Sequence, residues 1–400
     1  MLLKKNPSQL EFITLMASLM SIVALAIDAL LPALDMIGKD IGVTDTADNQ
    51  LFITMIFLGL GLGPMVFGPL SDSLGRKPVV FMGFALFFVA SLICVFAHNL
   101  EVMIVGRILQ GIALSAPRTI SIAMVRDSYS GDFMARIMSF ITVVFLLVPI
   151  VAPAFGKLVL DHSNWKFIFY IQLFFSALVC WWFWKRQPET LHAKDKKRLT
   201  YRIFIDGTRE VLSHRRTMVF TLISGFITGS FMVYLSSSQY VFQVQYGLKE
   251  EFPFIFAGLA ISIGLATLLN GNLVIRFGMQ NLVRVALKLY FLVSCLYIIM
   301  FHDAANPPVY ILLAFFAIQF FAVGFLFGNL RALAMEPIGH IAGIGAAITG
   351  LISTLMAVPI STYIGKFVTH DTVLPLFIGF SVCSFLSILL FWYVKLYRKG

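Results

Sequence analysis

The chain has 400 residues, of which 59% are hydrophobic and only 12% are charged, and its mean hydropathy is +0.89. Soluble domains contain about a quarter charged residues, so this composition excludes a soluble protein. The net charge of +10 does not indicate a nucleic-acid reader, because such proteins gather their basic residues on a soluble domain and this sequence offers none.

Apolar blocks of roughly twenty residues follow one another along the chain, and a helix of this length crosses about 30 Å of hydrocarbon. Backbone groups in a bilayer must bond within their own segment, which favours helices over the short alternating strands of a β-barrel. The sequence therefore predicts an all-α membrane protein with twelve transmembrane helices. The predicted spans are 12–34, 50–70, 79–97, 101–125, 136–160, 167–185, 217–241, 253–275, 284–301, 309–332, 341–366 and 374–395.

Basic residues are distributed unequally between the two sets of loops that these spans create. If the N-terminus is cytoplasmic, the outer loops receive only five of the thirty, namely Lys39, Lys157, Lys166, Lys249 and Lys366. The positive-inside rule therefore places both termini in the cytoplasm. The polar stretch 186–216 is predicted to be a cytoplasmic linker between an N-terminal six-helix bundle at 1–185 and a C-terminal one at 217–400. We interpret its basic run as a solvated face, with binding of anionic lipid headgroups as the alternative.

Cysteine and histidine give no sign of a metal site or of enzyme chemistry. The cysteines lie singly in separate spans, without metal-ligand spacing or paired outer positions, at Cys94, Cys180, Cys295 and Cys383. None of the seven histidines falls within a predicted span, and no serine, histidine and acid cluster is visible. We therefore expect no enzyme activity, no catalytic residue, no metal and no cofactor.

The loops after the second and eighth spans look like copies of one another. Gly68 and Gly75 in the first loop correspond to Gly271 and Gly278 in the second, at one constant offset. Parallel repeats of this kind imply a substrate site between the two halves.

The segment Gly68–Lys77 resembles the signature loop between spans 2 and 3 of the major facilitator superfamily, although Ser73 replaces its usual basic residue. Ile104–Gly111 is similar to the arginine motif of that family's proton-coupled drug antiporters. Together with Ala26–Leu34 and Val125–Asp127, it resembles the bicyclomycin-resistance (Bcr/CflA) branch with twelve spans. The resemblance covers essentially the whole chain and implies two pseudo-symmetric six-helix bundles, the major facilitator fold, in a bacterial inner membrane.

Asp28 is the one acidic residue predicted to lie inside a span. A charge at the bilayer centre costs about 2.5–3.5 kcal/mol on insertion scales, so a purely structural helix has no use for it. Removal from water makes a carboxyl group hold its proton, and a nearby cation favours release. Arg107 in span 4 is predicted at a similar depth, so we interpret both residues as the proton-coupling pair. The alternative is a fixed structural ion pair.

Other candidate residues follow from the resemblance and from polarity. The family's loop latches the protein on its cytoplasmic side, which implies a gate made by Gly68, Asp72, Gly75, Arg76, Arg126 and Asp127. Span 5 lacks a clean Gly-Pro antiporter motif, and its bending residues predict a hinge at Pro149, Pro153 and Gly156. Polar residues in apolar spans either line the substrate cavity or bond a neighbouring helix, and these are Gln110, Tyr234, Gln239, Gln319 and Asn329.

The sequence thus predicts a proton-coupled antiporter that exports small amphiphilic compounds, such as bicyclomycin or amphenicol-like drugs, by alternating access. Its expected partners are a small-molecule substrate, protons and the lipid bilayer, without nucleic acid, and we expect a monomer. Because no second intramembrane acid is available to pair with a dication, neutral or zwitterionic substrates are favoured. Two alternatives stay open: an exporter of an endogenous metabolite such as a siderophore, peptide or amino acid, and a non-transporting membrane sensor.

Overall fold

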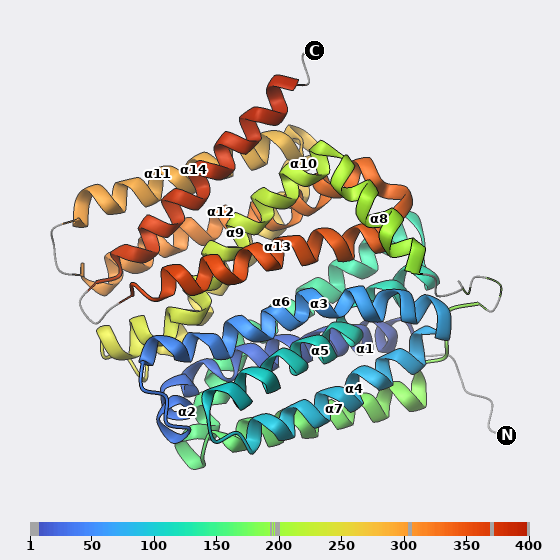
Figure 1. The fold of residues 1–400 in the computed structure, drawn as a ribbon, viewed down its shortest axis with the longest axis horizontal. Coiled ribbons are helices and arrows are strands. Elements are labelled where there is room, and N and C mark those ends of the chain that lie inside the picture. The colour runs from blue at the N-terminus through green and yellow to red at the C-terminus, as the bar shows by residue number, and fades with distance from the viewer. Residues whose placement is uncertain are drawn as a thin grey trace. The chain divides into compact units, whose positions relative to one another are not determined.

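The computed structural model describes residues 8–192, 194, 196, 201–302, 306–368 and 372–397. These residues form no β-strand, and they contain twelve helices of at least twenty residues (Figure 1). The long helices are α1 Gln9–Asp28, α3 Leu51–Leu74, α4 Arg76–Val95, α5 Leu100–Ser128, α6 Gly131–His162, α7 Lys166–Arg186, α9 Arg215–Gln239, α10 Phe252–Phe277, α11 Met279–Phe301, α12 Val309–Met335, α13 Ala342–Gly365 and α14 Leu374–Tyr397. The shorter ones are α2 Leu34–Asp40 and α8 Tyr201–Ser213, with single turns at Leu31–Ala33, Thr46–Gln50, Tyr240–Gln245 and Glu336–Ile341.

The long helices match the predicted spans. Ten stretches of the described chain are long and apolar enough to cross a membrane, and one of them, Val309–Gly365, contains both α12 and α13. The remaining long helix, α6, covers the span predicted at 136–160. The prediction of an all-α membrane protein with twelve transmembrane helices is therefore confirmed.

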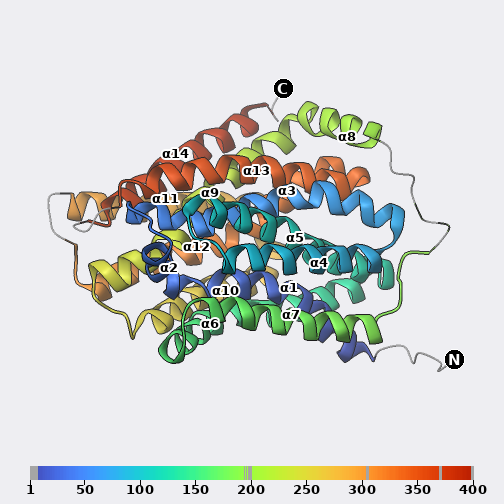
Figure 2. The same cartoon turned by 60° about the horizontal axis from the view of Figure 1, so that its bottom comes forward.

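The chain divides into two compact units. One consists of Met1–Thr44 and Met55–Tyr201, and the other of Asp45–Thr54 and Arg202–Gly400. In the first unit, α1 packs against α5, α6 and α7, and α4 packs against α5 and α7 (Figure 2). In the second, α9 packs against α12, α13 and α14, and α11 against α12 and α14. Each unit thus repeats one arrangement of six long helices.

The predicted linker is only partly covered by the structure. Residues 193, 195 and 197–200 lie outside the described residues, as do the two chain ends. Lys196 belongs to the basic part of this stretch, and its ammonium donates a hydrogen bond to the carbonyl of Leu74 at 3.3 Å. This part of the linker therefore contacts the end of α3.

Glycines allow α3 and α5 to approach closely in the first unit. A Cβ atom placed on Gly59 would lie 2.1 Å from the carbonyl oxygen of Ile108, and one on Gly63 would lie 1.9 Å from Oγ of Ser115. No side chain fits at these distances, so α3 packs on α5 through its glycine backbone.

The first span bends next to its carboxylate. Helix α1 ends at Asp28, and a single turn at Leu31–Ala33 leads into α2. Pro32 explains the break, because proline has no N–H to donate to the carbonyl four residues earlier, which belongs to Asp28. Helix α6 packs on the bend, since a Cβ atom on Gly156 would lie 2.0 Å from the carbonyl oxygen of Ala29.

Candidate functional site

The Asp28 side chain lies at the end of α1 and is only 5% exposed. Within the part of the chain that the structure describes, its carboxylate has no hydrogen bond and no ion pair. Ionisable groups inside membrane helices mark proton relays and substrate pathways, because a structural helix gains nothing from them. The carboxylate therefore has the position and the isolation expected of a group that exchanges protons.

Arg107 reaches α1 from α5, and its side chain is fully buried. Its Nη1 donates to the carbonyl of Ala26 at 3.2 Å and to Oε1 of Gln110 at 2.8 Å. Regular helix ends two residues after Ala26, which leaves this carbonyl available to a side-chain donor. In the described structure the guanidinium donates to the α1 backbone two residues before Asp28 rather than to its carboxylate, and a joint role of the two residues in proton coupling stays a prediction.

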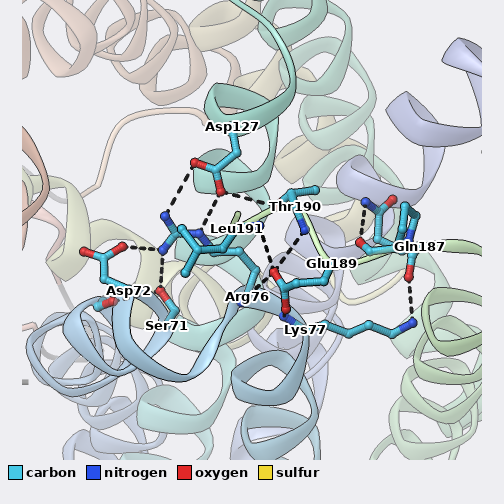
Figure 3. A network of polar contacts seen from close by, with 11 residues as sticks. Ser71, Asp72, Arg76, Lys77, Asp127, Gln187, Glu189, Thr190 and Leu191 are labelled. Carbon is cyan, nitrogen blue, oxygen red and sulfur yellow. Dashed lines mark hydrogen bonds and ion pairs between the residues drawn. The ribbon is translucent and has the colours of Figure 1, made fainter. Parts of the chain in front are cut away.

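A second polar cluster surrounds Arg76, the first residue of α4 (Figure 3). Arg76 is 3% exposed, its Nε donates to Asp127 at 2.8 Å and its Nη1 donates to Ser71 at 2.9 Å. Asp72 forms a second ion pair with Nη1. Thr190 donates its hydroxyl to Asp127 at 3.2 Å, so one carboxylate joins the start of α4, the end of α5 and the chain that follows α7.

Glu189 is a functional candidate that the sequence reasoning missed. Its carboxylate accepts the backbone N–H of Arg76 at 3.0 Å and that of Lys77 at 2.9 Å, which are the first two residues of α4 (Figure 3). A carboxylate at a helix N-terminus satisfies unpaired donors and complements the helix dipole. The preceding Gly75 has φ 116°, and a Cβ atom on it would lie 2.7 Å from Glu189 Oε2. Both the backbone conformation and the carboxylate therefore require glycine there.

Comparison with known proteins decides the family. The model of the Major Facilitator Superfamily matches residues 16–361. The chain belongs to this superfamily. It is 28% identical to an uncharacterized MFS-type transporter, YdgK, of Bacillus subtilis, over 88% of this chain and 87% of that one. It is also 25% identical to a bicyclomycin resistance protein homolog of Haemophilus influenzae, over 98% of each chain. The human organic anion transporter MFSD10 (TETRAN) has the same fold, with a TM-score of 0.69 at 16% identity over 97% of this chain and 99% of that one.

Gln110 and Gln319 of this major facilitator protein occupy equivalent positions in the two units. Gln110 on α5 donates to Oγ of Ser91 on α4 at 2.7 Å, and Gln319 on α12 donates to Oγ of Ser294 on α11 at 2.6 Å. The two serines are separated by the same offset as the glycines of the repeated loops. Both glutamines are fully buried and bond a neighbouring helix, which was the alternative to lining a cavity.

The other three candidates for the cavity are also buried. Gln239 donates to Gln243 at 2.9 Å, and Asn329 on α12 donates to Asn270 on α10 at 2.7 Å. Tyr234 is 3% exposed and packs within an aromatic cluster. The rings around it are those of Phe231, Phe316 and Phe320. In the described conformation these residues contact protein atoms, and a role in binding substrate stays a prediction.

The remaining gate and hinge candidates differ in what they contact. Arg126 is exposed, and the described residues provide it with no ion pair, so it takes no part in the Arg76 cluster. Gly68 accepts the Ser71 hydroxyl at its carbonyl, at 2.7 Å. Pro149 and Pro153 lie inside α6, on the same helix as the close contact at the α1 bend.

The second loop of the repeat keeps the glycine turn without the charges. Gly278 precedes α11 with φ 77°, as Gly75 precedes α4. Ile275 and Met279 stand where the first loop has its aspartate and arginine. The charged cluster is therefore a property of the first unit.

Proposed function

We propose that this major facilitator transporter is a proton-coupled antiporter that exports small amphiphilic compounds across the bacterial inner membrane by alternating access. The observation that carries the proposal is the Asp28 carboxyl group, which is buried inside a membrane helix and has no partner among the described residues. Binding a proton or a substrate stabilises such a carboxyl group in the membrane. Competition between proton and substrate for this group couples proton movement to substrate movement.

In this mechanism Asp28 takes up a proton from the outer side and loses it toward the cytoplasm. Substrate binds while the carboxyl group is deprotonated and is released when a proton arrives. One proton crossing 100 mV supplies about 2.3 kcal/mol and one pH unit about 1.4 kcal/mol. Together these sustain a several-hundredfold gradient of a neutral solute, so one carboxyl group is thermodynamically sufficient.

Arg107 has a positioning role in this proposal. Its bond to the carbonyl of Ala26 ties the last turn of α1 to α5, and its bond to Gln110, one turn along α5, fixes the orientation of the guanidinium. Gln110 is held in turn by Ser91 on α4. Arg107 thus holds the α1 backbone two residues before Asp28, and a change at the bend is transmitted to α5 and, through Gln110, to α4.

We assign the Arg76 cluster to the gate. The guanidinium is buried between Asp127 and Asp72, and the loop is joined by Glu189 to the chain after α7. Breaking a buried ion pair by removing one partner costs about 3–5 kcal/mol, so such a loop stays closed or opens as a unit. An exposed ion pair contributes about 0–1 kcal/mol to the free energy of unfolding. Ordinary surface charge pairing therefore does not explain why this arginine is buried.

The substrates that we propose are neutral or zwitterionic compounds of the bicyclomycin or amphenicol type. The support is the similarity to the bicyclomycin resistance protein homolog and the presence of a single membrane-embedded carboxyl group at Asp28. Export of an endogenous metabolite, such as a siderophore, peptide or amino acid, uses the same machinery and is the second candidate. We further propose that the protein acts as a monomer with both termini in the cytoplasm.

The test is proton release from everted membrane vesicles on addition of each compound of a panel that includes bicyclomycin, chloramphenicol and metabolites. We expect a response from the native protein and none from Asp28→Asn. Asp161→Asn is the matched control, because that aspartate forms an exposed pair with Lys157 within α6. A full response from Asp28→Asn would refute proton coupling at this residue, and a response to metabolites alone would favour the second candidate.

A further inference from the structure

Helices α1 and α7 of the first unit are pinned together at two levels. At one end, Arg186 donates from Nε and Nη2 to the Glu11 carboxylate at 2.5 and 2.7 Å. Further along, Gln172 donates from Nε2 to the carbonyl of Leu25 at 3.3 Å. Fourteen residues separate the two contacts in each helix. The helices therefore run antiparallel in a constant register between these contacts.

This register places Ser21 of α1 and Ser176 of α7 at one level, one turn from the Gln172 contact. Oγ of Ser21, Oγ of Ser176 and Oε1 of Gln172 are all buried, and none of the three has a hydrogen-bond partner among the described residues. Gln172 is 1% exposed and Ser176 is 2% exposed. Three buried polar oxygens on two adjacent levels of one helix interface are thus left to bind something other than the protein.

The neighbouring hydroxyls of α1 behave differently. Thr14 and Ser18 donate to carbonyls of their own helix four residues earlier, at 2.9 and 2.8 Å. Serine usually bonds in this way inside a helix, and Ser21 and Ser176 do not. Their oxygens remain available to a third group between the helices.

Water is the group that fits three neutral oxygens. A buried water makes about three hydrogen bonds to polar atoms that would otherwise be unsatisfied, and it both donates and accepts. An amide oxygen accepts only, whereas each hydroxyl does both. Neutral oxygens without a carboxylate are poor ligands for a metal cation, since Ca²⁺ and Mg²⁺ sites are built on carboxylates.

Ser21 lies on the face of α1 that leads to Asp28. Ser21, Leu25 and Asp28 are spaced by four and three residues, which puts them on one face of α1. The same spacing continues in the other direction through Ser18 and Thr14 to Glu11, where Arg186 is bound. The charged groups along this face are therefore Asp28 at one end and the Glu11–Arg186 pair at the other, with Arg107 of α5 beside the Asp28 end.

We propose that α1 and α7 enclose a hydrated seam, built on Ser21, Gln172 and Ser176, that conducts protons between Asp28 and the Glu11 end of α1. The inference rests on the proposed antiport function and specifies the route for its proton. Asp28 gives a proton to the adjacent water and becomes a carboxylate, each water passes one proton on, and one proton leaves at the Glu11 end. The seam is unchanged after each passage, so no other reactant is needed.

Radiolytic footprinting of the full-length protein in liposomes tests the water directly. Water held in the seam produces hydroxyl radicals on X-ray exposure, and the adjacent Leu25 and Leu173 become labelled. We expect this labelling in the native protein and its loss in the double variant Ser21→Ala with Ser176→Ala. Ser18→Ala is the matched control and should keep the labelling, because that hydroxyl is bonded to its own helix. Unlabelled leucines in the native protein would overturn the proposal.

Proton movement is the second readout, measured with an entrapped pH dye and chloramphenicol as the probe. Losing two hydrogen bonds to the bridging water should slow proton movement by about tenfold or more in the double variant, with chloramphenicol affinity unchanged. A native rate in that variant would also overturn the proposal. If the native protein moves no protons with chloramphenicol, the proposed function fails for that substrate, while the footprint still decides whether the seam holds water.

Discussion

Replacement of Glu189 by alanine is the sharpest test of the cluster around Arg76. The first two N–H groups of α4, those of Arg76 and Lys77, have no partner within the helix because they belong to its first turn. Their partner is the Glu189 carboxylate, at 3.0 and 2.9 Å. The variant removes both bonds while leaving the apolar packing of α4 intact. The change therefore isolates the capping role of this carboxylate.

The expected magnitude follows from the number of bonds and from their exposure. Loss of a helix cap costs about 0.5–2 kcal/mol, and hydrogen bonds to a charged group lie at about 1.5–3 kcal/mol. Because the Glu189 side chain is exposed, solvent screens its charge, and we expect the lower part of this range, about 1 kcal/mol. Since 1.4 kcal/mol corresponds to a factor of ten, the first turn of α4 should open about fivefold more often.

Hydrogen–deuterium exchange of a peptide that begins several residues before Arg76 and includes Lys77 measures this opening directly. Exchange of the first two amides of α4 should be about fivefold faster in Glu189→Ala, and Glu189→Gln should give an intermediate rate because it keeps one acceptor oxygen. Glu210→Ala, which removes the partner of His340 in the second unit, is the control and should leave this peptide unchanged. Unchanged exchange in Glu189→Ala would show that the carboxylate does not cap α4.

Two further substitutions test the bend of α1. Arg107→Ala removes the donor to the carbonyl of Ala26 and should lower the melting temperature and slow transport, because two buried acceptors lose a partner at about 1–3 kcal/mol each; a native melting temperature would contradict this. Gly156→Ala should impair transport strongly, since the added Cβ would lie 2.0 Å from the carbonyl of Ala29. Gly258→Ala, whose Cβ would meet nothing within 4 Å, should transport normally, and equal transport by both glycine variants would refute the packing argument.

Hydropathy and spacing predicted the fold of this protein. Blocks of roughly twenty apolar residues predict membrane helices whatever surrounds them, because the cost of an unbonded backbone in lipid is local to each segment. The repeated glycines at Gly75 and Gly278 predicted two copies of one bundle, and both have a positive φ before an equivalent helix. The isolated carboxyl group of Asp28 was found in the same way, since one acid in an apolar span is conspicuous without any structure.

Only the tertiary structure decided which groups meet. Depth alone suggested Arg107 as the counter-charge of Asp28, but the rotation of α5 against α1 directs the guanidinium to the carbonyl of Ala26. Glu189 looks like any linker residue in the sequence, and it becomes a cap because the chain after α7 returns to the start of α4. Hydropathy is a sum over neighbours along one segment, whereas a hydrogen bond depends on the rotation and register of two segments that are distant in the chain. The sequence by itself therefore determined the spans and the buried charge, and packing determined their partners.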